Sequence, residues 1–258
     1  MSVLLPASSL AWREVIRFLR QRSRVLGSLG QGILLWVLIG GGFQASFRPP
    51  GARMGYVEYF FPGILALVVL FTAVFATIAV VEDRHSGFLQ GVLVSPVPRW
   101  GVVLGQAAGS TILAVGQAVI LLPLAPLIGV PLTFESAAAA IGVMTLVALA
   151  VSGLSLIIAW KLTTTQGFHA IMNLIIFPLW WLSGSLFPQQ GLPGWIAWIV
   201  KLNPLTYGIV ALRRAIYIPE PEAVAGLAPM GVSLAVSAAF CLLMFGMAVR
   251  AANTSKLR

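Results

Sequence analysis

About six apolar stretches, each long enough to cross a bilayer, fill this chain, and most of its charges lie between them. The clearest stretch is 60–81, which holds no charged residue and is followed directly by Glu82 and Asp83. A helix rises about 1.5 Å per residue, so ~20 apolar residues cross the ~30 Å hydrocarbon core. We therefore predict an all-α, polytopic membrane protein, a single transmembrane domain over 1–258, with six spans at 28–47, 60–81, 102–128, 136–160, 170–188 and 228–249.

The composition agrees with a membrane protein. The chain is 59% hydrophobic and only 9% charged, with a mean hydropathy of +0.97, whereas soluble domains are about 25% charged. Its one cysteine, Cys241, excludes a disulfide framework and a cysteine-based metal site. The net charge of +9 comes from residues that flank apolar spans, which favours anionic lipid headgroups over nucleic acid as the counter-charge.

Lysine and arginine are distributed unevenly between the two ends of the predicted spans. Cytoplasmic flanks carry the excess of these residues in membrane proteins, so the richer side is predicted to be cytoplasmic, with both termini on it. The first 24 residues hold five arginines and no long apolar run, so no cleaved signal peptide is expected. The richer side would hold Arg13, Arg17, Arg20, Arg22, Arg24, Arg84, Arg99, Lys161, Arg250, Lys256 and Arg258, and the other Arg48, Arg53, Lys201, Arg213 and Arg214.

Residues 9–24 are predicted to form an amphipathic helix that does not span the membrane. Arg13, Arg17, Arg20 and Arg24 recur at helical spacing on one face, and the apolar residues from Trp12 to Leu19 fall on another. A helix of this kind lies in the interface plane. It serves either as a topology anchor or as a mechanical part that meets a cytoplasmic partner.

The loop 82–99 is predicted to contain a short cytoplasmic helix. Acidic residues open the loop, the apolar run from Phe88 to Leu93 follows, and Ser95-Pro96 ends it because proline cannot donate a backbone hydrogen bond. Exposed apolar groups of such a helix need a partner. The alternative is an interfacial loop with its apolar side in lipid.

Residues 189–214 are predicted to form two short re-entrant or interfacial helices on the outer side. Each apolar piece is too short to cross, and Asn203-Pro204 separates them. Trp195, Trp198 and Tyr207 suit the membrane interface.

The sequence offers little catalytic chemistry. Ser183 and Ser185 near the outer end of the fifth span could act in a membrane-embedded enzyme, but both histidines are predicted in loops on the opposite side. No span centre holds an ionisable residue, which argues against a proton relay. A phosphate-cradling G-x-x-x-x-G-K-[ST] loop is absent, since each of the three lysines is followed by leucine. A non-transporting scaffold remains a further alternative.

Three segments resemble those of the permease subunits of type-2 ABC exporters, the family that includes daunorubicin-resistance and nodulation-factor permeases. Residues 82–99 read EDRHSGFLQGVLVSPVPR, similar to the family's E-x-x-x-G-x-L-(E/Q)-x-L-L-x-S-P-V-x-R. Residues 202–213 contain LNPLTY and ALR, like its N-P-(L/F)-T-Y and A-L-R. Residues 182–188 read LSGSLFP, like (L/F)-S-G-x-x-(F/Y)-P. Phe88 departs from the small polar residue common at its position.

The resemblance implies a division of roles. The segment 82–99 would be the coupling helix that docks on a cytoplasmic ABC ATPase, with 9–24 beside it, and two copies each of permease and ATPase would form the transporter. The chain itself would bind no cofactor and would not be an enzyme, because ATP and Mg would bind the ATPase. The residues implied in coupling are Glu82, Asp83, Gly87, Phe88, Leu89, Leu93, Arg13 and Arg17.

The implied function is export of an amphipathic substrate, a drug, lipid or glycolipid, across a bacterial or archaeal cytoplasmic membrane. Apolar and aromatic walls suit such substrates; the alternative is that these rings face lipid. The predicted pathway residues are Trp36, Phe43, Phe71, Phe75, Phe177, Trp180 and Trp181. The segment 189–214 would form the outer gate, with Trp195, Trp198, Asn203, Pro204 and Tyr207.

Overall fold

The structure is a computed structural model that describes residues 4–43, 55–188 and 192–254, and its regular elements there are all helices. Five of them are long and apolar enough to cross a membrane. These are α2 (Arg22–Phe43), α3 (Tyr56–His85), α5 (Arg99–Leu121), α6 (Phe134–Ala159) and α10 (Met230–Thr254). The shorter helices are α1 (Leu4–Arg20), α4 (Phe88–Val94), α7 (Thr165–Trp181), α8 (Gly194–Leu202) and α9 (Pro204–Ile216), with 3₁₀ turns at Leu122–Leu124, Pro126–Ile128 and Pro221–Val224.

The all-α, multi-pass class is confirmed, and the span boundaries need correction. The predicted fifth span, 170–188, is helical only as α7, because the Thr164 hydroxyl caps an earlier start at the Gly167 N–H and Gly184 turns the chain at φ +80°. Its 17 residues rise about 26 Å. The predicted third span, 102–128, ends as a regular helix at Leu121, which agrees with the kink or early end that Pro123 and Pro126 predict. Positions 44–47 of the first span lie outside the described residues.

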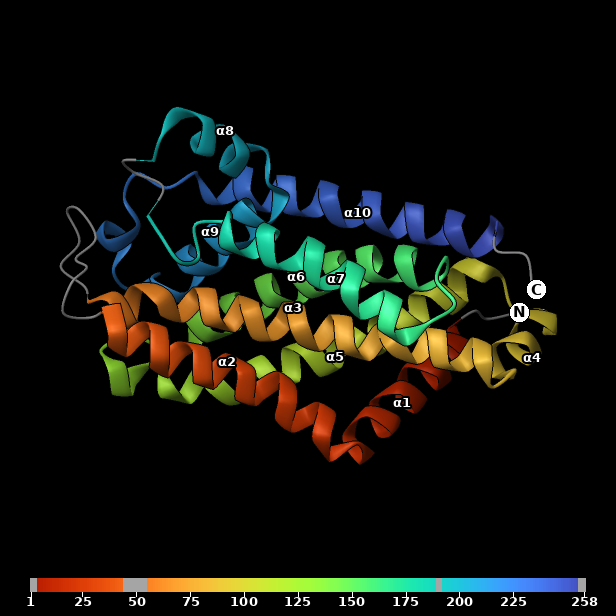
Figure 1. Ribbon diagram of the computed structural model, residues 1–258. Coiled ribbons are helices and arrows are strands. Elements are labelled where there is room, and N and C mark those ends of the chain that lie inside the picture. The colour runs from red at the N-terminus through yellow and green to blue at the C-terminus, as the bar shows by residue number, and fades with distance from the viewer. Residues whose placement is uncertain (1–3, 44–54, 189–191, 255–258) are drawn as a thin grey trace.

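Helix α3 is the centre of the bundle. It is buried along nearly all its length, and it packs against α2, α5, α6, α7 and α9 (Figure 1). Pro62 lies inside this helix and cannot donate to the carbonyl of Glu58 four residues earlier. The Tyr217 hydroxyl donates to that carbonyl at 3.2 Å, so the proline is compensated by a tertiary contact.

The predicted N-terminal helix, 9–24, is two helices that meet at Gln21. Helix α1 packs on α5, and α2 turns away from it along α3. Arg24 therefore belongs to α2, although the sequence pattern places it on the same helix as Arg13. In Figure 1, α4, the start of α1 and the end of α10 lie at the same end of the bundle, and α8 lies at the other.

Candidate functional site

A network of ion pairs joins α1, α2 and the end of α3. Arg13 donates two hydrogen bonds to the Asp83 carboxylate, at 2.7 and 2.9 Å. Arg17 bridges both carboxylates, at 2.7 Å to Asp83 and 2.6 Å to Glu82, and Arg24 pairs with Glu82. Charge-assisted contacts in which one arginine donates two hydrogen bonds to carboxylates stabilise the fold and also fix the relative position of the two side chains. The network therefore holds α1 and the first turn of α2 against the start of the 82–99 segment.

Helix α4 lies directly beside this network. Gly87 opens it with a left-handed φ of +75°, which a side chain would rarely adopt. The Arg13 guanidinium lies 3.7 Å from the centre of the Phe88 ring, so the same arginine contacts both α3 and α4. Val94, at the far end of α4, is 83% exposed.

Leu89 corrects one expectation about α4. We expected its apolar residues to be exposed, but Leu89 is buried in the main hydrophobic core, and Leu93 is partly buried against that core. Leu89 and Val94 are five positions apart in the helix, so they cannot lie on the same face. Leu89 thus seats α4 on the protein, and Phe88 and Val94 provide the exposed apolar surface.

Other contacts connect the 82–99 segment to the remaining helices at this end. Arg84 donates to the carbonyls of Trp160 and Leu162, at 2.8 and 3.2 Å, and His85 contacts the carbonyl of Thr163. Arg99 donates to the last carbonyls of α10, at Ala252 and Asn253. Cations at helix C-termini are stabilising. A displacement of 82–99 would therefore directly reach the segment that joins α6 to α7 and the end of α10.

Four of the predicted pathway rings form one continuous series between α3 and α7. The centroids of Phe71 and Phe177 are 5.1 Å apart, Phe71 and Phe75 are 5.9 Å apart, and Phe177 and Trp181 are 6.2 Å apart. Trp181 is 57% exposed. Two alternatives are predicted for these rings, that they line a pathway or that they face lipid. Both fit a series whose last ring, Trp181, is exposed.

The other three rings lie apart from this series. Trp36 and Phe43 on α2 contact Phe61 and Tyr56 of α3. Trp180 is fully buried, and its indole Nε1 donates to the Gly63 carbonyl at 2.9 Å. Trp180 therefore fastens α7 to α3.

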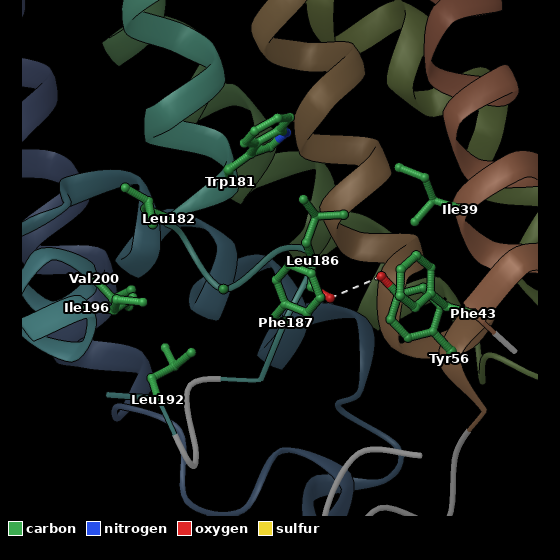
Figure 2. Close-up of a pocket in the computed structure, with 11 residues that line it drawn as sticks. Ile39, Phe43, Tyr56, Trp181, Leu182, Leu186, Phe187, Leu192, Ile196 and Val200 are labelled. Carbon is green, nitrogen blue, oxygen red and sulfur yellow. Dashed lines mark hydrogen bonds between the residues drawn. The ribbon is translucent and has the colours of Figure 1, made fainter. Parts of the chain in front are cut away.

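An apolar pocket of about 460 Å³ lies at the end of the bundle opposite α4, between the end of α2, the start of α3, the end of α7 and α8. Figure 2 shows α2 and Tyr56 on one side of it and α8 on the other. The Tyr56 hydroxyl donates to the Leu186 carbonyl at 3.0 Å, and Tyr59 donates to the Gly184 carbonyl at 2.9 Å, so these backbone acceptors in the wall are satisfied. The lining residues are Ile39, Phe43, Tyr56, Trp181, Leu182, Gly184, Leu186, Phe187, Leu192, Ile196 and Val200.

Helices α8 and α9 form the bent pair expected in 189–214, with an angle of 80° between them; residues 189–191 lie outside the described part. Asn203 caps α9 through the Leu205 N–H at 3.0 Å and donates to the Leu179 carbonyl at 2.6 Å. Pro204 occupies the first turn of α9, where it needs no N–H partner. The Tyr207 hydroxyl donates to the Lys201 carbonyl at 3.1 Å. Trp195 and Trp198 are 69% and 68% exposed on α8.

Sequence reasoning missed the structural role of Arg213 at the end of the bundle opposite α4. Its side chain is buried, donates to the carbonyls of Tyr59 and Gly184 at 3.2 and 3.4 Å, and lies 3.9 Å from the centre of the Tyr59 ring. The A-L-R segment signalled this position, but only the fold brings α9 against α3 and the 182–188 segment.

The serine-enzyme alternative finds no base in the described residues. Ser183 and Ser185 are fully buried, and their hydroxyls bond to each other at 2.8 Å. His169 lies on α7, not in a loop as expected, and the helical rise from it to Trp181 is about 18 Å. The two serines close the turn after α7, and Ser185 packs where any Cβ on Gly63 would lie.

The fold and these contacts define a helical, multi-pass membrane protein whose 82–99 segment is tied to the rest of the bundle. Residues 7–217 match the family model described as ABC-2 type transporter, and the chain belongs to that family. Members are the permease subunits of ABC transporters; they are not enzymes themselves, and they work with an ATP-binding subunit.

Individual relatives agree with the family. The chain is 28% identical to the transport permease named ycf38 of Cyanophora paradoxa, over 78% of this chain and 70% of that protein. It is 25% identical to nodulation protein J of Rhizobium meliloti, over 79% of this chain and 76% of the relative. The daunorubicin resistance ABC transporter permease protein DrrB1 of Streptomyces coeruleorubidus is 22% identical, over 80% and 70%.

Proposed function

We propose that this chain is the permease half of an ATP-driven exporter in a bacterial or archaeal cytoplasmic membrane, with both termini in the cytoplasm. Two copies would assemble with two ATPase subunits, which would bind ATP and Mg²⁺. The lysine and arginine asymmetry supports the orientation. The relative named for daunorubicin resistance supports the outward direction, since a transporter can confer resistance by exporting a toxic compound.

The observation that carries the proposal is the attachment of α4 to the ion-pair network through Arg13. Closure of the ATPases would push the exposed surface of α4, at Phe88 and Val94. Because Arg13 contacts both the Phe88 ring and the Asp83 carboxylate, this push would pass into α1 and α3. Rigid rocking of one permease against the other would follow, a switch by rotation at an interface.

The outer pocket supports an amphipathic substrate. Its walls are apolar and its wall carbonyls at Gly184 and Leu186 are already satisfied, so it suits an alkyl or aromatic group better than a polar one. Phe43 and Trp181 of the predicted pathway line this pocket, and α8 forms its outer wall through Ile196 and Val200. Movement of α8 and α9 would then open the pocket outward, which is the role proposed for the outer gate.

The coupling proposal is tested with Val94→Asp in the complex of the full chain with its ATP-binding subunit, reconstituted in lipid. Val94 is 83% exposed, so the substitution should leave the bundle folded. A charge in an apolar contact should weaken docking by about 2 kcal/mol or more. We expect at least a tenfold loss of co-purified ATPase subunit, with an unchanged melting temperature of the chain alone.

Phe134→Asp is the matched control, because Phe134 is 92% exposed at the start of α6, at the opposite end. It should keep full ATPase association. If Val94→Asp bound the ATPase subunit as well as the unmodified chain does, α4 would not be the docking helix. If Val94→Asp and Phe134→Asp lost the ATPase subunit equally, general destabilisation would be the cause.

A further inference from the structure

A shallow groove of about 610 Å³ runs along one side of α1 and reaches the junction with α2. Trp12, Ile16 and Arg20 line it at intervals of four residues, and Arg13 and Arg17 form the adjacent row. Ser9 and Gln21 complete the lining. The groove therefore combines an aromatic-aliphatic wall with three guanidinium groups.

The charges in this groove are not balanced within the described chain. Arg13 and Arg17 pair with Asp83 and Glu82, but Arg20 has no ion pair among the described residues. Five arginines between positions 13 and 24 face only three carboxylates, those of Glu14, Glu82 and Asp83. The region keeps an excess of positive charge, so the groove is complementary to an anion.

The apolar residues beside the groove indicate where that anion lies. Trp12 lines the groove and is 66% exposed. Leu19 of α1 and Leu26 of α2, which do not line the groove, are 57% and 69% exposed. Tryptophan and leucine on a basic helix are typical of the boundary between headgroups and acyl chains. A docked protein would have to cover this apolar surface as well, whereas a bilayer covers it without further contacts.

We propose that the α1 groove binds the phosphate headgroup of an anionic phospholipid from the cytoplasmic leaflet. Arg20 supplies the free charge, and Arg17 shares the anion from the next row of the helix. Trp12 and Ile16 pack against the glycerol and upper acyl chain. Since Arg17 also holds Glu82 and Asp83, a lipid here would reinforce the attachment of α1 to α3. Headgroup binding itself depends neither on the direction of transport nor on its substrate.

The test uses the full chain in nanodiscs of equal phosphatidylglycerol and phosphatidylcholine, released into the gas phase for native mass spectrometry of the retained lipids. The unmodified chain should retain phosphatidylglycerol in preference to phosphatidylcholine. Arg20→Gln should lower that preference by about fivefold, because it removes the one groove arginine that has no ion pair among the described residues. Arg20→Lys, which keeps the charge, should restore most of it.

Arg22→Gln is the matched control, because Arg22 is exposed one residue beyond the junction and does not line the groove. It should leave the lipid preference unchanged. Equal retention of the two lipids by the unmodified chain, or equal losses in Arg20→Gln and Arg22→Gln, would overturn the site. The same holds if Arg20→Gln weakens binding of the ATPase subunit and spares lipid retention, since the groove would then be a protein contact. Displacement of the retained lipid by glycerol phosphate at millimolar concentration would show a free phosphate site instead.

Discussion

Glu14 is a carboxyl placed where its charge is poorly tolerated. It lies on the face of α1 that packs on α5, and burial raises its pKa to about 7. The charges nearest to it are those of Arg13, Arg17, Arg24 and Asp83, and the arginines only partly offset the burial. The other carboxylates at this end, Glu82 and Asp83, are instead held directly by arginines. Among the described residues, Glu14 thus lacks the direct ion pairs that Glu82 and Asp83 have.

The raised pKa of Glu14 gives stability a defined pH dependence. The folded chain keeps the proton up to about pH 7, whereas the unfolded chain releases it near pH 4.5. Stability should therefore fall as pH rises from about 4.5 to 7, by up to about 3 kcal/mol, and stay level above that. Glu14→Gln should flatten this part of the curve and raise the melting temperature at pH 8, as measured by thermal unfolding in detergent across this range. Parallel curves for the two proteins would show that Glu14 is not buried as described.

At the scale of elements, the close approach of α1 and α5 decides where the N-terminal helix lies. A Cβ on Gly105 would come within 2.7 Å of the Ala7 carbonyl, and one on Gly109 within 2.9 Å of the Glu14 Cβ. Small residues allow helix backbones to approach in this way. The sequence of α1 predicts an interfacial helix, but in the structure α1 also packs closely against α5.

Gly109→Ala should separate α1 from α5. The added methyl group meets backbone of α1 at Ala11, which cannot move aside as a side chain would, so we expect a loss of about 1–3 kcal/mol. Weaker association of the ATPase subunit should accompany it, because Arg13 and Arg17 move with α1. Gly116→Ala on the same helix has open space around its Cβ and should be neutral or slightly stabilising. Thermal unfolding measures the stability of the unmodified chain and of the two variants, and co-purification measures how well each binds the ATPase subunit. If Gly109→Ala and Gly116→Ala gave the same results, the packing argument would be wrong.

For the whole molecule, burial is distributed very unevenly among the long helices. Helix α3 is almost entirely buried, but α2 and α10 expose most of their apolar surface. In a bilayer such a surface meets either lipid or another protein chain. The residues that line the pocket include Ile39 and Phe43 of α2 and none of α10, so we place the proposed second permease against α2 rather than α10.

Oxidative cross-linking tests this arrangement. With Cys241 replaced by alanine, Leu38→Cys on α2, which is 61% exposed, should form a covalent dimer in membranes. Leu242→Cys on α10 is 72% exposed and should form little, because that face would meet lipid. Dimer yields on non-reducing gels provide the measurement. Stronger cross-linking through α10 would place the partner on the opposite face.

The sequence predicts much of this fold because its signals are local. Apolar length defines the long helices, Ser95-Pro96 ends α4, and Asn203-Pro204 separates α8 from α9. It misplaces the predicted fifth span, 170–188, since the Thr164 cap and the Gly184 turn shift α7 toward the N-terminus.

By itself the sequence determines the class, a multi-pass helical membrane protein, because transfer of apolar segments into lipid depends on composition and length. Only the tertiary structure decides that Leu89 is buried, that Trp180 fastens α7 to α3, and that Arg13 joins α4 to α3. These contacts connect residues far apart in the chain. Which face of each helix they occupy depends on how neighbouring backbones pack, and hydropathy carries little information about packing among apolar residues in lipid.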